Sequence, residues 1–304
     1  MIEGKPIPLP GAMSFTIDSK YVNDQFEIRV FQPPRLPPPA DDMGFQVPDA
    51  FRVIYTLDAN AGFASVVGTT SILPGDPDGG PCEYLIVVGI GYPVTDGEDS
   101  KIALLRSRDM TPPGTPEPPE MEMFKQMAGN PDIGFGQADN FLRFLEEELD
   151  PLIRREFPCL PDKAGLFGFS YGGLFALYAL FSRSPMFDRY IIGSPASVME
   201  GDPILDYEKR CWDEGPELNA EAFITLGSLE RTSMLSGLQL LATNYDKLIA
   251  RLEQRNYEGL EWSAQEFENE SHMSYVILSL SHGLRRLFPG QPSPMMDDVR
   301  KESE

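Results

Sequence analysis

The chain has 304 residues, of which 41% are hydrophobic and 24% charged, a balance that supports a sizeable buried core and excludes wholesale disorder. Its formal net charge is −22 at pH 7. Because so acidic a surface repels phosphate backbones and anionic lipid headgroups, we expect no nucleic-acid and no membrane partner. No apolar run approaches the roughly 18 residues that a membrane span needs, and the first residues carry no signal-peptide pattern.

The predicted elements begin with two strands, at residues 14–19 and 26–31, in which apolar and polar residues alternate as in half-exposed antiparallel strands. The later strands are short and mostly apolar, which is typical of strands buried on both faces of a sheet. We expect them at 51–57, 84–89, 166–169, 190–192, 222–226 and 260–267, with helices at 140–157, 174–181, 238–254 and 274–287. This order predicts an α/β fold with a mostly parallel central sheet, antiparallel N-terminal strands and helices on both faces.

We expect a single domain over residues 1–290. Two proline-rich stretches, at 33–39 and 112–119, must be loops, but neither separates two self-sufficient apolar patterns. The polar segment 291–304 is predicted to be a flexible tail.

Three cysteines, Cys82, Cys159 and Cys211, have no C-x-x-C spacing, which argues against a disulfide framework and against a zinc ribbon. A reducing compartment fits such cysteines best, so the predicted location is cytoplasmic. Nothing in the sequence predicts a metal or another cofactor.

The segment Gly168-Phe169-Ser170-Tyr171-Gly172 has the pattern G-x-S-x-G and stands where an apolar strand is followed by a buried helix. This is the arrangement of the nucleophile elbow of α/β-hydrolases. In so tight a turn, side chains two residues before and after Ser170 are expected to collide, so glycine is predicted to be required at 168 and 172. Gly173 is expected to let the helix approach the sheet closely. Ser170 then lies at a helix N-terminus, where the amide of Tyr171 can stabilise an oxyanion.

A nucleophilic serine needs a base, and the chain has only two histidines, His272 and His282. His272 follows the last predicted strand, where the base of this fold belongs, whereas His282 falls inside the final helix and is expected to be a packed or surface residue. Glu230 is the first carboxylate after the strand at 222–226, so it is the predicted acid that orients the imidazole. The alternatives are Asp206, Glu268, Glu270 and a Ser–His pair without an acid.

A second oxyanion donor is expected from the loop after the strand at 51–57, as the backbone amide of Ala59 or Asn60. Residues 198–219 interrupt the alternation of strands and helices, and we expect either a lid over Ser170 or a surface excursion. Their apolar side chains, Met199 and Trp212 among them, suit the wall of a substrate pocket.

The stretch 168–181 (GFSYGGLFALYALF) resembles the elbow of the putative-esterase family, which includes the enterochelin and ferric-siderophore esterases and, more distantly, esterase D and the S-formylglutathione hydrolases. The resemblance spans about residues 50 to 285 and implies an α/β-hydrolase fold and a serine esterase with Ser170 as nucleophile, His272 as base and Glu230 as acid. The further segments that resemble the siderophore-esterase branch are 55–58 (YTLD), 88–92 (VGIGY), 106–112 (RSRDMTP), 136–141 (GQADNF), 193–195 (GSP) and 227–230 (GSLE).

The sequence gives two opposed indications about the substrate. Family members that open ferric catecholate trilactones need cationic contacts, and Arg106 and Asp109, in the RSRDMTP segment, are candidate substrate contacts. The other arginines considered for this role are Arg108, Arg183 and Arg231. Because a net charge of −22 disfavours the approach of anions, we expect a neutral small ester rather than a ferric siderophore. The alternatives are a siderophore trilactone esterase, an acyltransferase or thioesterase, and a non-catalytic binding module of this fold.

Overall fold

The computed structural model describes residues 8–34, 48–76, 82–93, 99–127, 129, 133–195, 201 and 203–290. The predicted tail at 291–304 and the proline-rich stretch from residue 35 onward lie outside these residues. In the described part of the chain, no helix is long and apolar enough to cross a lipid bilayer.

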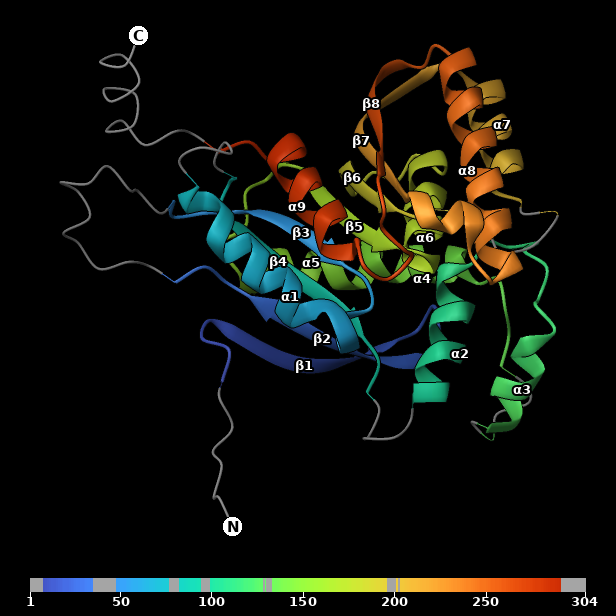
Figure 1. Ribbon diagram of the computed structural model, residues 1–304. Helices are drawn as coiled ribbons and strands as arrows, with labels where there is room; N and C mark the ends of the chain where they lie inside the picture. Colours follow the sequence, from blue (N-terminus) through green and yellow to red (C-terminus); the bar gives the residue numbers. More distant parts are fainter. Residues whose placement is uncertain are drawn as a thin grey trace, which may run out of the picture.

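Eight strands of the described residues form one sheet in the order β1-β2-β4-β3-β5-β6-β7-β8 (Figure 1). Strand β1 (Ala12–Ser19) pairs antiparallel with β2 (Asp24–Phe31), and β2 pairs antiparallel with β4 (Leu85–Gly91). All other neighbours are parallel. The remaining strands are β3 (Arg52–Thr56), β5 (Ala164–Phe169), β6 (Phe187–Gly193), β7 (Glu217–Gly227) and β8 (Glu258–Phe267). The predicted mostly parallel sheet with antiparallel N-terminal strands is confirmed.

Helices cover both faces of this sheet (Figure 1). On one face lie α1 (Ala59–Ile72) and α9 (Val276–Leu287), over a core cluster that includes Phe167 on β5. The larger cluster on the other face includes Leu166, the neighbour of Phe167, because successive side chains of a strand point to opposite faces. The helices that contribute to this larger cluster are α2 (Asp99–Met110), α3 (Glu120–Met127), α4 (Ala138–Phe144), α5 (Asp150–Glu156), α6 (Tyr171–Phe181), α7 (Ile204–Glu214) and α8 (Ser236–Gln254).

The helix predicted at 140–157 is not a continuous α-helix. A π-turn at Leu145–Leu149 separates α4 from α5. Pro151 stands at the beginning of α5 and has no N–H to donate, so the regular hydrogen-bond ladder cannot pass through it.

Helix α1 was not predicted, because its sequence is rich in small and β-branched residues and contains Gly62 and Gly68, so no clear apolar stripe marks it. It nevertheless buries Phe63 and Val66 against the sheet. Tertiary packing therefore stabilises a helix that its intrinsic propensity does not favour.

Candidate active site

Ser170 lies in the turn between β5 and α6, at backbone angles of φ 59° and ψ −119°, which residues with a side chain rarely adopt. Its N–H donates to the carbonyl of Gly193 on β6 over 2.9 Å, and its carbonyl accepts from the N–H of Leu174 over 2.9 Å. These two bonds join the turn to the neighbouring strand and to its own helix, so the surrounding structure holds the strained conformation.

The glycines around Ser170 are not equally required. A Cβ placed on Gly168 would lie 2.0 Å from the carbonyl oxygen of Gly172, and one on Gly173 would lie 2.5 Å from the carbonyl oxygen of Gly193. Both approaches are too close for any side chain, which confirms the predictions for 168 and 173. A Cβ on Gly172 would meet nothing nearer than a Leu57 methyl at 3.4 Å, so the prediction that position 172 requires glycine is wrong.

The predicted base and acid are in contact. Glu230 lies in the 3-10 turn Ser228–Thr232 that follows β7, and His272 lies in the loop between β8 and α9. Nδ1 of His272 is 3.3 Å from Oε1 of Glu230, whose side chain is fully buried. The two loops are joined by a hydrogen bond of 3.0 Å from the Leu229 N–H to the Glu270 carbonyl. The Glu270 carboxylate itself accepts a hydrogen bond from Ser274.

Two buried hydroxyl groups behind Glu230 were not predicted. Ser194, at the end of β6, donates to the same Glu230 oxygen over 2.6 Å, and the Tyr275 hydroxyl contacts Ser194 Oγ. Burial, and then the nearby Glu230 carboxylate, raise the pKa of Tyr275, so this phenol stays protonated and can donate to Ser194. The Gly-Ser-Pro segment at 193–195 marks the position in the sequence, but nothing local indicates the contact with Glu230.

The loop that begins α1 is held in place by the side chains of Asn60 and Arg29. Asp58 precedes the helix in the left-handed region, at φ 56°. The side-chain amide of Asn60 donates to the Tyr92 carbonyl over 2.9 Å and accepts from the Tyr92 N–H over 2.8 Å, while Arg29 donates to the Ala59 carbonyl over 2.9 Å. The first amides of a helix have no acceptor within it. The amides of Ala59 and Asn60 therefore belong to a helix N-terminus that is held firmly in place.

A cavity of about 680 Å³ opens beside Ser170, between the starts of α1 and α9 and one side of α2. Ser170, His272 and Asn60 line it, whereas Ala59 is fully buried. The described lining residues are Thr56, Leu57, Asp58, Asn60, Ala61, Gly62, Ser65, Val66, Ile102, Ala103, Arg106, Phe167, Phe169, Ser170, His272, Met273, Val276 and Ile277.

Arg106 lines the cavity, as predicted for a substrate contact, but its charge is already paired. Its Nε and Nη2 each donate over 2.8 Å to one of the two carboxylate oxygens of Asp58. The guanidinium also lies 5.2 Å from the centre of the Tyr171 ring. Arg106 thus joins the residue before α1 to the first residue of α6, the two helices whose N-termini flank Ser170.

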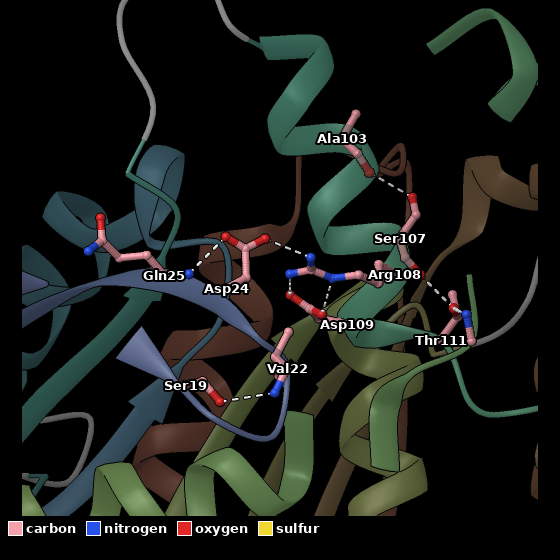
Figure 2. A network of polar contacts seen from close by, with 10 residues as sticks. Ser19, Val22, Asp24, Gln25, Ala103, Ser107, Arg108, Asp109 and Thr111 are labelled. Atoms are coloured by element: carbon pink, nitrogen blue, oxygen red, sulfur yellow. Dashed lines mark hydrogen bonds and ion pairs between the residues drawn. The ribbon is translucent and has the colours of Figure 1, made fainter. Parts of the chain in front are cut away.

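Asp109 does not lie in this cavity. It is fully buried and accepts two hydrogen bonds, of 2.7 and 3.0 Å, from Arg108, which also donates to Asp24 at the start of β2 over 2.7 Å (Figure 2). Burial raises the pKa of Asp109, and the Arg108 guanidinium opposes that rise. The sequence placed Asp109 at the substrate because it shares the RSRDMTP segment with Arg106. The Asp109 carboxylate is instead bound by Arg108, and through Arg108 it joins α2 to the N-terminal strands.

Two predicted pocket residues remain, Trp212 and Met199. Trp212 lies away from the cavity, and Met199 lies outside the described residues. Trp212 on α7 packs edge-on against Tyr257, 5.1 Å between ring centres, with the Arg255 guanidinium 5.0 Å from its ring, and is not among the described residues of the cavity. Helix α7 packs against α6, on the face of the sheet opposite α1 and α9, so Trp212 does not face the cavity beside Ser170. Met199 and the rest of the predicted lid up to residue 200 lie outside the described residues.

Within the described part of the chain, no group of three or more His, Cys, Asp or Glu side chains is arranged to hold a metal ion. The three cysteines are free thiols.

Residues 116–237 match the protein family described as Putative esterase. The chain is 29% identical, over 93% of its length and 92% of the other protein, to the ferri-bacillibactin esterase BesA of Bacillus subtilis. It is 28% identical, over 94% of its length and 96% of the other protein, to a siderophore triacetylfusarinine C esterase of Aspergillus fumigatus. The crystal structure of the BES protein from Bacillus cereus matches with a TM-score of 0.74 at 29% identity, covering 95% of this chain and 100% of that one. The predicted resemblance is confirmed, and the chain is an ester hydrolase of the α/β-hydrolase fold, related to the family described as Putative esterase.

Proposed function

We propose that the chain is a serine esterase in which Ser170, His272 and Glu230 form a catalytic triad. Neutral His272 takes the proton of the Ser170 hydroxyl as its oxygen attacks the ester carbonyl, and then gives that proton to the departing alcohol. Water, deprotonated by His272 in turn, hydrolyses the acyl group from Ser170. The backbone amides of Tyr171 and of Asn60 or Ala59 stabilise the negative oxygen of each tetrahedral intermediate.

The observation that carries this proposal is the 3.3 Å contact between His272 Nδ1 and the buried Glu230 carboxylate, beside a cavity that both His272 and Ser170 line. A carboxylate at Nδ1 fixes the tautomer that leaves Nε2 to accept the serine proton, and it stabilises the imidazolium that forms. The strained backbone of Ser170 and the nearby helix N-termini are the further features that this chemistry needs.

We further propose that the preferred substrate is a neutral small ester. Among the described lining residues, the acidic and basic side chains apart from the imidazole of His272 are Asp58 and Arg106, and these form an ion pair with each other. The other arginines considered for an anionic substrate are also engaged: Arg108 by Asp109 and Asp24, Arg183 by the carbonyls of Cys211, Gly215 and Glu217, and Arg231 by Asp246 and Glu266. A cavity with paired charges on a chain of net charge −22 offers little to attract an anion.

A siderophore ester is the second candidate. It is supported by the names of the relatives, a ferri-bacillibactin esterase and a triacetylfusarinine C esterase, which align with 93% and 94% of the chain. The two candidates differ in the charge that the site must accept. A ferric tris-catecholate carries three negative charges, whereas in a ferric tris-hydroxamate three anionic ligands cancel the charge of the iron.

The nucleophile is tested with a fluorophosphonate probe. We expect covalent labelling of the wild type and none of Ser170→Ala, together with loss of ester hydrolysis in that variant. Labelling that persists in Ser170→Ala would overturn the proposed mechanism.

The substrate charge is tested by measuring kcat/KM for a neutral nitrophenyl ester, a ferric trihydroxamate ester and a ferric catecholate trilactone, each at low and high salt. We expect the trilactone to be the poorest substrate and to gain most from added salt, because salt screens charges beyond about 8–10 Å. A clear preference for the trilactone would refute the neutral-substrate proposal while leaving the triad intact.

A further inference from the structure

The part of the cavity away from α2 is a groove lined by α1 and α9. These two helices lie side by side on one face of the sheet (Figure 1). On α1 it is lined by Gly62, Ser65 and Val66, which lie on one face of the helix because residues three and four apart are neighbours. On the opposite side it is lined by Val276 and Ile277 in the first turn of α9. We call this α1–α9 part of the cavity the apolar groove. The side chains of Phe167 and Phe169, on the same face of β5, also line the cavity.

The apolar groove is continuous with the site at Ser170, since both belong to one cavity. From Asn60, beside Ser170, to Val66 the helix rises by about 9 Å, at 1.5 Å for each residue. The charged pair Asp58–Arg106 lies at the Ser170 end. Beyond this pair and Asn60, Ser65 is the one polar side chain that the described residues of α1 and α9 contribute to the lining.

Gly62 keeps the groove open. It stands inside α1, where glycine is among the least favourable residues, and a Cβ at this position would meet nothing within 4 Å. Neither backbone geometry nor packing therefore requires glycine here. What a larger residue would occupy is the space of the groove itself.

Apolar side chains at the rim of the groove face water. Met273 is 75% exposed and Ile277 is 41% exposed, although each also lines the cavity. An apolar ligand that covers these groups removes them from water, and this favours binding of the ligand.

We propose that the apolar groove binds an unbranched apolar chain of the ester substrate and that Gly62 sets the chain length that fits. This inference rests on the proposed esterase function of Ser170 and adds the chemical class of its substrate. The ester carbonyl lies at Ser170, and one alkyl chain, of the acid or of the alcohol, extends between α1 and α9. Binding is favoured by the burial of the methylene groups of this chain against Val66, Phe167 and Ile277.

The test measures kcat/KM in two series, nitrophenyl esters of acids from acetyl to decanoyl, and acetates of alcohols of the same lengths. Each methylene that the groove buries is expected to raise kcat/KM about fourfold in one of the series, until the groove is full. Between a four-carbon and an eight-carbon chain the wild type is then expected to gain on the order of 100-fold. The series that shows the gain tells whether the acid or the alcohol chain is bound.

Two pairs of variants test where the alkyl chain of the substrate binds. Gly62→Phe fills the groove from α1, and its control is Gly68→Phe, on the same helix, also with nothing within 4 Å but not among the described lining residues. Ile277→Trp narrows the groove from α9, and its control is the neighbouring Leu278→Trp, at a residue that is 37% exposed and likewise not among them. We expect each groove variant to reduce the eight-carbon to four-carbon ratio of kcat/KM by at least tenfold, and each control to leave that ratio and the activity unchanged.

Thermal unfolding of all four variants separates loss of fold from loss of the groove, and the ratio is read only from folded protein. If Gly62→Phe folds poorly, Ile277→Trp decides. No gain with chain length in either series, or equal changes in variants and controls, would overturn the proposal. If Ser170→Ala is inactive while the ratio is insensitive to these variants, only the groove proposal fails. If Ser170→Ala retains activity, the proposed function fails first.

Discussion

One oxygen of Glu230 serves both as the partner of His272 and as the acceptor for Ser194. Nδ1 of His272 is 3.3 Å from Oε1 of Glu230, and the Ser194 hydroxyl donates to the same atom over 2.6 Å. The three residues come from three different connections, after β8, β7 and β6, which meet because parallel strands present their carboxyl ends at one edge of a sheet. The position of His272 is therefore held by its own loop and also by a buried network on the neighbouring strands.

If Glu230 orients His272, Glu230→Gln should lower kcat by about 10²–10⁴-fold, less than the roughly 10⁴-fold or greater loss expected for Ser170→Ala. An amide cannot stabilise the imidazolium as a carboxylate does. Steady-state kinetics on a nitrophenyl ester provide the measurement. Glu270→Gln, one of the alternative acids, is the control and should stay within about threefold of wild type. A larger loss in Glu270→Gln than in Glu230→Gln would show that the acid is misassigned.

Ser194→Ala should lower kcat about tenfold and leave KM nearly unchanged, because the Glu230 carboxylate loses its donor while the cavity lining is untouched. Tyr275→Phe should have a smaller effect, since Tyr275 reaches Glu230 through Ser194. Equal kcat values for Ser194→Ala and wild type would mean that this network supports folding alone.

The two histidines should differ in both activity and pH dependence. His272→Ala should be nearly as damaging as loss of Ser170, whereas His282→Gln should retain activity. Burial, and then the Arg285 charge, lower the pKa of His282, so the folded state binds its proton less readily than the unfolded state. The stability that neutral His282 contributes is present above pH about 6.5 and is lost as the pH falls below it.

The melting temperature of the wild type should consequently fall more steeply between pH 7 and pH 5 than that of His282→Gln. Thermal melts across this range provide the measurement. Parallel curves for the two proteins would contradict the assigned cause.

The glycines of the elbow should respond to alanine in opposite ways. Gly168→Ala places a methyl group 2.0 Å from a backbone oxygen that cannot move aside, so we expect destabilisation by about 3 kcal/mol or more. Gly172→Ala meets only ordinary contacts and lies in a helix, so stability should be unchanged or raised by up to about 1 kcal/mol. Denaturant unfolding measures both, and similar losses at the two positions would contradict the geometry of the turn.

Asp58→Asn should shift substrate preference toward anions, because it leaves the Arg106 guanidinium unpaired at the cavity wall. We expect kcat/KM for a nitrophenyl hemisuccinate, relative to the neutral butyrate, to rise about three- to tenfold at low salt and less at high salt. Asp246→Asn, which removes an acidic partner of Arg231 far along the sequence, changes the net charge equally and serves as the control. An equal rise in both variants would assign the effect to net charge and not to the Arg106 pair.

The sequence alone determined the order of the sheet strands along the chain, the elbow at Ser170, and the histidine and acid that follow the last two strands. These features depend on local patterns, such as apolar runs, a glycine-flanked serine and the place of a residue after a strand, and each leaves a trace within a few neighbouring positions. His272 could be singled out because only one other histidine exists.

Only the tertiary structure decided which side chains share the cavity. Arg106 and Asp109 are three positions apart, yet one pairs with Asp58 beside Ser170 and the other is buried with Arg108 against the first strands. Ser194 contacts Glu230, which is 36 positions away in the sequence. Tyr275, which is 81 positions from Ser194, contacts Ser194 and so reaches Glu230 through it. Helix α1, with no apolar stripe of its own, forms because the sheet buries one side of it, and its open side at Gly62 then becomes a wall of the groove. Such contacts are set by the packing of distant segments against one another, and no local pattern of residues encodes them.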